Sequence, residues 1–109
     1  MIKIFYNKEI EIYNKGKYKD EFGITHNGGY KLADTLMVDV QPYSSEKLKK
    51  DYGYDLECTK RIFCDLNENI KESSIIKHHN EFFDIKKIIE WDDYLDIVVI
   101  EHKGSVEIV

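Results

Sequence analysis

The chain has 109 residues and a mass of 12.9 kDa, which is enough for one domain built around a single hydrophobic core. Hydrophobic residues make up 42% and charged residues 34% of the sequence, a balance typical of folded proteins and not of disordered ones. The 16 basic and 21 acidic residues give a net charge of -5, which disfavours tight binding to duplex nucleic acid.

The first third of the chain predicts a β-hairpin followed by a long loop. Residues 2–6 and 9–13 alternate between apolar and polar side chains, and the Asn7-Lys8 pair between them predicts a turn. Residues 14–31 are polar and contain four glycines, which is typical of a mobile loop. Within this loop, residues 22–25 favour a short fragment of strand.

A strand and a short helix follow. Residues 35–41 alternate in polarity up to Pro42, which has no backbone N–H to donate and therefore ends the strand. Residues 44–53 change to helical spacing, with Ser44 as the N-cap and Gly53 as the residue that ends the helix. A helix of about two turns is not stable alone in water, so it must pack on a neighbour or become ordered with a partner.

The second half of the chain predicts short strands joined by tight turns. The expected strands are residues 56–65, 74–79, 82–91, 95–100 and 106–108, with reversals at residues 67–69, 80–81, 92–93 and 103–104. We therefore expect an all-β fold, a small antiparallel β-barrel similar in size to an SH3 domain, because closure of the sheet removes its exposed edges. The side chains expected to line its interior are Val38, Val40, Ile62, Phe83, Ile85, Ile89, Trp91, Leu95, Ile97 and Val99.

The two cysteines are expected to be buried free thiols. Cys58 and Cys64 are six residues apart in a predicted strand, where they would share one face but lie about 20 Å from each other. No CxxC motif or paired histidine spacing accompanies them. No apolar run approaches the roughly 18–20 residues of a membrane-spanning helix, and no signal-peptide pattern follows Met1. We expect a soluble protein synthesised in the cytoplasm.

Two groups of side chains are candidates for metal binding or catalysis. His78 and His79 would point to opposite faces of a strand, and no further ligand stands at the spacing that a metal site needs. Acidic residues surround Trp91 at a strand end and a turn, where aspartate is common for local hydrogen bonding. These acidic residues are Glu90, Asp92, Asp93 and Asp96. No GxSxG, Walker or GxGxxG motif occurs, so we expect a non-enzymatic protein without metal or cofactor.

Positive charge is concentrated in the middle of the chain, close to three tyrosines. The residues are Lys47, Lys49, Lys50, Lys60 and Arg61. Interleaved basic and aromatic side chains suit single-stranded nucleic acid. The simpler interpretation, which we favour, is a solvated helix face in which Glu46 pairs with Lys50 and Lys47 pairs with Asp51.

Residues 38–46, with the sequence VDVQPYSSE, resemble the head-completion proteins of long-tailed bacteriophages, also called stopper or head-closure proteins. In that family a strand ends in a V-Q-P-like turn, and a polar segment rich in Glu, Lys and Tyr follows. The resemblance covers residues 35–103, including the strand of residues 54–64, the Phe82-Phe83-Asp84-Ile85 sequence and the late strand of residues 95–101. The glycine-rich residues 14–31 and the helical character of residues 44–52 depart from the family pattern.

The resemblance implies a structural protein of the virion, located in the head-to-tail connector. Such barrels form a homo-oligomeric ring with the portal and adaptor rings above it and tail proteins below it. The segment of residues 43–55 would face the axial channel and help to retain packaged DNA by steric contact. The channel-facing residues implied in this way are Tyr43, Ser44, Ser45, Glu46, Lys47, Lys49, Lys50, Asp51, Tyr52 and Asp55.

Two alternatives remain open. One is a small nucleic-acid-binding or metal-dependent nuclease module that uses the basic stretch or the region of His78. The other is a tail-completion or minor capsid protein with a similar barrel. For the isolated chain we expect a monomer or a weak oligomer, with residues 14–31 and 43–55 mobile until neighbouring subunits order them.

Overall fold

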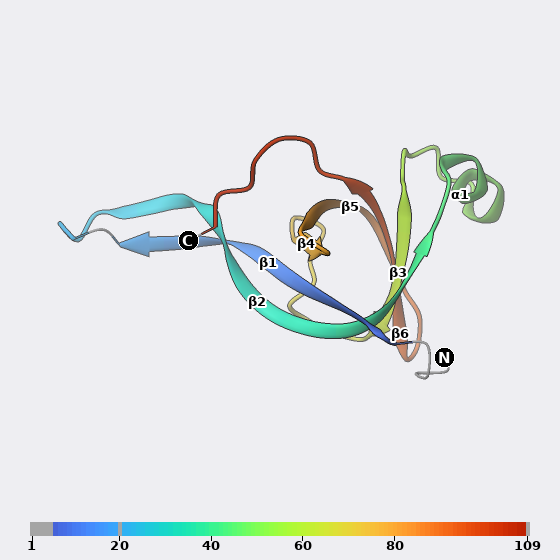
Figure 1. Cartoon of the computed structure of the whole chain (residues 1–109), viewed down its shortest axis with the longest axis horizontal. Helices are drawn as coiled ribbons and strands as arrows, with labels where there is room; N and C mark the ends of the chain where they lie inside the picture. The colour runs from blue at the N-terminus through green and yellow to red at the C-terminus, as the bar shows by residue number, and fades with distance from the viewer. Residues whose placement is uncertain (1–5, 20, 109) are drawn as a thin grey trace.

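The described residues form one closed barrel of six antiparallel strands with one short helix beside it (Figure 1). The computed structural model describes residues 6–19 and 21–108, and of residues 17–19 and 25–28 the backbone alone. The elements are β1 (Lys8–Lys19), β2 (Thr25–Pro42), α1 (Ser45–Tyr52), β3 (Lys60–Asp65), β4 (Ile75–His78), β5 (Glu81–Glu90) and β6 (Tyr94–Glu101). The predicted all-β class, a small antiparallel barrel with one short helix, is confirmed.

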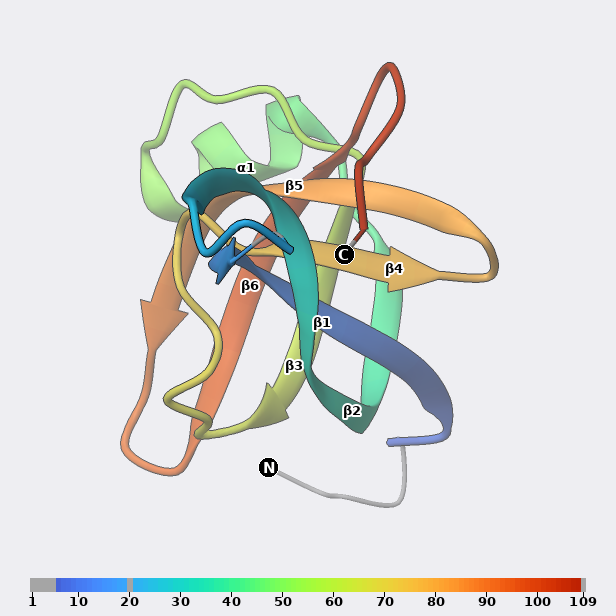
Figure 2. The same cartoon turned by 90° about the vertical axis from the view of Figure 1, so that its left-hand side faces the viewer.

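The barrel closes because each strand pairs with two others. The order around the barrel is β1-β2-β3-β6-β5-β4, and β4 returns to β1 through the pairs Glu11↔Lys77, Ile12↔Ile76 and Tyr13↔Ile75. Figure 2 shows the strands wrapped around a common interior, with α1 at one end. Among the described residues, no helix is long and apolar enough to span a membrane.

Hydrophobic side chains from all six strands, and one from the connection between β3 and β4, fill the interior. They are Ile10, Ile12, Val38, Ile62, Cys64, Ile70, Ile76, Phe83, Ile85, Leu95, Ile97 and Val99, with Leu36, Val40 and Ile88 packed against them. Burying such branched side chains is the main source of stability in a domain of this size. The predicted interior is confirmed except at two positions, Ile89 and Trp91.

An irregularity in β5 explains these two exceptions. The register with β6 shifts by one residue between Ile85 and Lys87. Because side chains alternate strictly along a strand, one extra residue reverses the face to which all later side chains point. Ile88 therefore packs against the barrel interior, Ile89 packs outside it, and Trp91 is 43% exposed. The prediction that Ile89 and Trp91 line the interior is wrong.

The expected loop at residues 14–31 is instead a long β-hairpin. The pairing of β1 with β2 extends from Lys8↔Val38 to Lys19↔Thr25, interrupted by two irregularities. Beyond Tyr13, where the pairing with β4 ends, the two strands project from the barrel along the longest axis of a molecule that measures 52 × 29 × 25 Å (Figure 1). We call residues 14–31 the arm. None of the arm side chains that the structure describes belongs to a hydrophobic cluster, and the arm lacks the alternating apolar pattern that would have predicted its strands.

The predicted and observed structures also differ at the ends of several other strands. The strand at residues 9–13 is present, but its described partners are β2 and β4. Residues 2–6, the other strand of the predicted hairpin, fall mostly outside the described residues. The strand expected from residue 56 begins only at Lys60. The reversal before β5 is formed by His79 and Asn80, whose positive φ angles of 50° and 63° suit a tight hairpin turn.

Candidate channel-facing segment and assembly surfaces

The helix α1 begins and ends where the sequence predicts. The Ser44 hydroxyl oxygen accepts a hydrogen bond from the Lys47 backbone N–H at 3.1 Å, which satisfies one free donor of the first turn. At the other end Gly53 has a φ of 78°, a left-handed conformation that glycine adopts without strain, and its N–H donates to the Lys49 carbonyl oxygen at 2.8 Å.

One face of α1 covers a second, smaller hydrophobic cluster on the outside of the barrel. Its buried members are Tyr43, Leu48, Cys58 and Val98, with Tyr52, Leu56 and Ile89 at its edge. Leu48 is fully buried. A helix of two turns is too short to be stable alone, so this packing against the barrel stabilises it. Of the two possibilities that the sequence left open for this helix, the structure shows packing against its own barrel.

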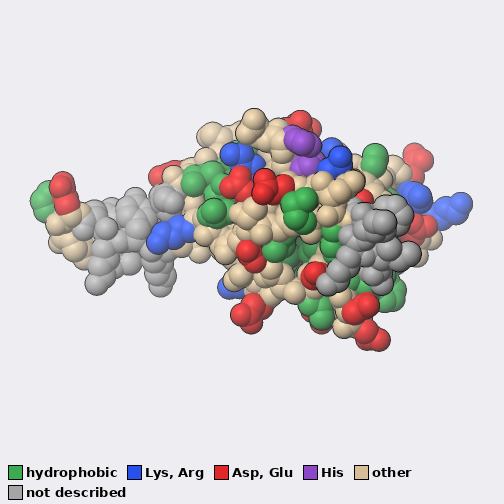
Figure 3. All heavy atoms as spheres, turned by 60° about the horizontal axis from the view of Figure 1, so that its bottom comes forward, with side chains coloured by type: hydrophobic (Ala, Val, Ile, Leu, Met, Phe, Trp, Pro, Cys, Tyr) green, Lys and Arg blue, Asp and Glu red, His purple; other side chains and the backbone are tan. Residues whose placement is uncertain are grey.

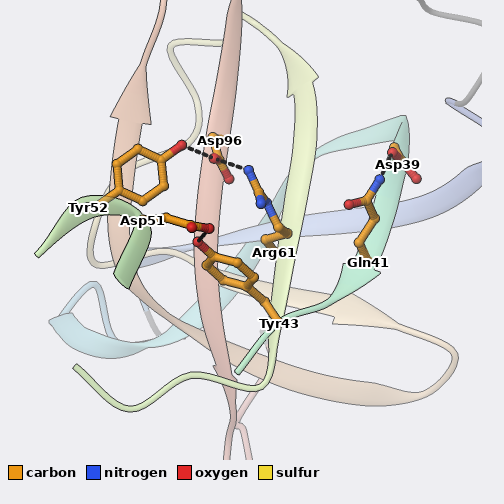
Figure 4. Close-up of polar contacts among 7 residues, drawn as sticks. All are labelled: Asp39, Gln41, Tyr43, Asp51, Tyr52, Arg61 and Asp96. Carbon is orange, nitrogen blue, oxygen red and sulfur yellow. Dashed lines mark hydrogen bonds and ion pairs between the residues drawn. The ribbon is translucent and has the colours of Figure 1, made fainter. Parts of the chain in front are cut away.

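Polar contacts link α1 directly to β6 and, through Asp96, to β3 (Figure 4). The Tyr52 hydroxyl, in the last turn, donates to Asp96 Oδ2 on β6 at 3.2 Å. Arg61 Nη2 on β3 donates to the same Asp96 oxygen at 2.8 Å. The Tyr43 hydroxyl, just before the helix, donates to Asp51 Oδ2 at 2.7 Å. The helix is therefore tied to β6 at its last turn, in addition to the packing of Leu48.

Arg61 makes its contacts within the protein. Its guanidinium carbon lies 4.5 Å from the ring centroid of Tyr43 and 4.4 Å from that of Phe63, in addition to the ion pair with Asp96. Its side chain is only 16% exposed. Arg61 thus holds the helix to the barrel and does not belong to an exposed basic surface.

Asp96 lies on the outward side of β6 beneath α1, and its side chain is 1% exposed. Burial raises the pKa of Asp96, although the guanidinium of Arg61 and two hydrogen bonds act in the opposite direction. Glu90, Asp92 and Asp93 are exposed. The four acidic residues predicted to lie together around Trp91 are therefore separated. Asp96 forms a buried ion pair, and the other three are exposed at the turn. The outward position of Asp96 misled the sequence interpretation, because only α1 makes that position buried.

The ten predicted channel-facing residues divide into an anchored and an exposed set. Tyr43 is buried, and Ser45 and Tyr52 are half-buried. Ser45 Oγ accepts a hydrogen bond from the Cys58 backbone N–H at 3.1 Å. The remaining residues are exposed, and they are Ser44, Glu46, Lys47, Lys49, Lys50, Asp51 and Asp55. Three acidic and three basic side chains therefore balance on the outer surface of this segment.

His78 and His79 lie side by side, with ring centroids 4.0 Å apart. The prediction that they point to opposite faces is wrong, because His79 lies in the turn after β4 and not in the strand. His78 is 7% exposed, and its Nδ1 lies 3.2 Å from the carbonyl oxygen of Glu9. Among the described residues, no group of three or more His, Cys, Asp and Glu side chains is arranged to hold a metal ion.

We expect His78 to make stability depend on pH. Burial lowers the pKa of His78 in the folded chain, although the contact with Glu9 acts in the opposite direction. Between about pH 7 and pH 5 the unfolded chain therefore takes up more protons at this residue, so the free energy of unfolding should fall as the pH falls. Urea titrations at several pH values should show a shallower decline for His78→Gln. An unchanged pH dependence in His78→Gln would contradict this account.

Cys58 and Cys64 are free and buried, as predicted. They do not share a strand face, because Cys64 lies in the barrel interior and Cys58 lies under α1, before β3 begins. Burial, with a smaller contribution from Asp65, raises the pKa of Cys64 to about 12. Such a thiol is protonated at neutral pH and is a poor nucleophile.

The fold also occurs in a protein of known structure. No family model matches the chain, and no curated protein matches it. The solution structure of protein SF1141 from Shigella flexneri 2a, a structural genomics target, is similar with a TM-score of 0.72 over 91% of this chain and 95% of that one. The two sequences are 19% identical, so the likeness shows a common fold.

Proposed function

We propose that this chain is a non-enzymatic structural protein of a bacteriophage head-to-tail connector. Identical barrels would form a ring around the DNA channel, between the portal or adaptor ring and the tail. The observation that supports this best is that the barrel carries two different projections, the arm and α1, at separate ends (Figure 1). A subunit of a ring needs one surface that reaches its neighbours and another that faces the channel.

The outer surface of α1 suits a channel through which DNA passes and is then retained. Affinity for DNA rises with the number of phosphates that basic side chains neutralise. Here Lys47, Lys49 and Lys50 are offset by Glu46, Asp51 and Asp55, so the surface meets DNA without binding it tightly. Retention would then be steric, and the bond from α1 to β6 together with the packing of Leu48 would keep the helix in place against the pressure of packaged DNA.

Disruption of the gene in the phage that carries it tests this proposal. We expect lysates that contain separate heads and tails in place of joined particles, because the connector ring would be missing. Negative-stain electron microscopy measures this directly, and a plasmid copy of the wild-type gene should restore joined, infectious particles. Joined and infectious particles without any functional copy of the gene would contradict the proposal.

A variant of the exposed lysines separates a connector from a nucleic-acid-binding module. In the complementation experiment, Lys47→Gln, Lys49→Gln and Lys50→Gln together should still give particles that retain their DNA. A protein that acts by binding phosphates would lose most of its affinity, and the salt dependence of that affinity, from the same change. Failure of this folded variant to complement would favour the nucleic-acid-binding alternative.

A further inference from the structure

The arm exposes large apolar side chains at its tip and at its base. Phe22 is 80% exposed and Ile24 is 58% exposed near the tip, and Leu32, directly after the arm, is 53% exposed. A two-stranded hairpin with no sheet beneath it is only marginally stable in water. An extended hairpin that presents apolar side chains therefore suits contact with another protein surface.

Charge is distributed unequally between the arm and the rest of the chain. Residues 14–31 contain four lysines and two acidic residues, whereas the remainder contains 12 basic and 19 acidic residues. The arm therefore carries a formal charge of +2, and the remainder carries -7. Two arms repel each other, whereas an arm and the barrel of another copy attract each other.

The turn between β5 and β6 offers the barrel surface that matches the arm best. Trp91 is 43% exposed and stacks on Tyr94, with ring centroids 6.1 Å apart. The exposed Glu90 and Asp92 flank it in sequence, and Glu90 also lines a groove with Leu66, which is 49% exposed. We call Leu66, Glu90, Trp91 and Asp92 the acidic-aromatic patch. Figure 3 shows acidic and apolar side chains close together on the barrel.

We propose that the arm of one copy docks on the acidic-aromatic patch of the next copy. The inference rests on the connector function and names the contact that would build its ring. The turn that carries the patch lies far from the arm (Figure 1), so one chain cannot make the contact with itself. The two surfaces differ, and such head-to-tail contacts generate closed rings when the rotation between copies closes.

The strand edges of the arm agree with this choice of partner. On the β2 edge, the Tyr30 N–H donates to the Glu107 carbonyl oxygen at 2.7 Å, and Tyr30 forms a parallel bridge with Ile108. The C-terminal segment thus covers part of this edge and limits the pairing of one arm with another. The exposed side chains of the arm can still contact a patch of opposite charge.

Charge exchange between the two surfaces tests the docking proposal. One variant carries Lys15→Glu and Lys31→Glu on the arm, and the other carries Glu90→Lys and Asp92→Lys on the patch. We expect the wild type to self-associate in sedimentation velocity at high concentration and low salt, and each variant alone should lose this association. An equimolar mixture should recover it, because the acidic arm then meets a basic patch and the basic arm meets an acidic patch.

Cross-linking locates the contact in the wild type. A zero-length carbodiimide should join Lys15 or Lys31 of one copy to Glu90 or Asp92 of another, as peptide mass spectrometry can identify. The control variant Lys47→Glu/Lys49→Glu makes the same change of charge on α1 and should associate as the wild type does. Circular dichroism should show that all variants are folded.

Several results would overturn the docking proposal. A wild type that stays monomeric at every concentration and gives no such cross-link would do so, as would an arm variant that associates normally. Loss of DNA binding in the arm variant, with association unchanged, would make the arm a nucleic-acid contact instead. The connector function is tested separately, because separate heads and tails after gene disruption would support it even if the docking proposal failed.

Discussion

The Phe83→Ala substitution is expected to lower the free energy of unfolding by about 3–5 kcal/mol. Phe83 is 2% exposed and belongs to the interior cluster where β5 pairs with β4 and β6. Its removal leaves a cavity that the closed barrel cannot easily collapse. Since small domains are stable by only about 5–15 kcal/mol, a large part of the stability should be lost. Urea denaturation followed by circular dichroism measures the change.

Trp91→Ala is the matched control for this experiment, because it removes an even larger aromatic side chain from the same strand region. Trp91 lies beyond the register shift in β5 and is 43% exposed, with Tyr94 as its stacked neighbour. The loss should be less than about 1 kcal/mol. If Trp91→Ala destabilised the protein as much as Phe83→Ala, the register shift and the outward position of Trp91 would be wrong.

The Asp96→Ala substitution should lower the free energy of unfolding by about 3–5 kcal/mol, as much as Phe83→Ala does, but for an electrostatic reason. It leaves the guanidinium of Arg61 largely buried without its carboxylate partner, and it removes the acceptor of the Tyr52 hydroxyl. Because Tyr52 belongs to α1, backbone amides of the helix should also exchange with solvent faster than in the wild type. Denaturant titration and hydrogen exchange measure the two effects.

Two further variants separate the ion pair from simple loss of charge. Asp92→Ala removes an exposed carboxylate from the neighbouring turn and should change the free energy of unfolding by no more than about 0.5 kcal/mol. The double variant Arg61→Met/Asp96→Leu removes both charges and should recover much of the stability that Asp96→Ala loses. The expectation assumes that each charge of the pair mainly offsets the cost of burying the other. A double variant less stable than Asp96→Ala would contradict this and would show that the ion pair itself stabilises the fold.

Local signals in the sequence were sufficient for much of the fold. Ser44 and Gly53 determine the ends of α1 through backbone hydrogen bonds made within a few residues. Pro42 ends β2, and the alternation in β6 places Leu95, Ile97 and Val99 in the interior. Each of these features depends on neighbours in the chain or on a simple period of two, which a sequence displays directly.

Features that depend on distant parts of the chain were not predicted. One inserted residue between Ile85 and Lys87 leaves no mark in the composition but reverses the orientation of every later side chain in β5. The described side chains of the arm belong to no hydrophobic cluster, and its strands carry no apolar period. Asp96 is buried only because α1 lies over it, and the partnership with Arg61 joins residues 35 positions apart.

The candidate channel-facing segment was located by resemblance, and its internal organisation came from the structure. The charge balance of residues 46–55 is visible in the sequence. The sequence did not show that Tyr43, Ser45 and Tyr52 anchor the segment while the charged residues remain exposed. Tyrosines at both ends of a short helix, followed by a strand that carries an arginine, are the signal from which such anchoring could have been predicted.

The connector proposal implies that a bacteriophage carries the gene, and electron cryo-microscopy of the head-to-tail junction in purified particles of that phage tests it most directly. The proposal predicts a ring of these six-stranded barrels between the portal and the tail, with α1 directed toward the channel. Infectious particles whose resolved junction contains no copy of this barrel would contradict it.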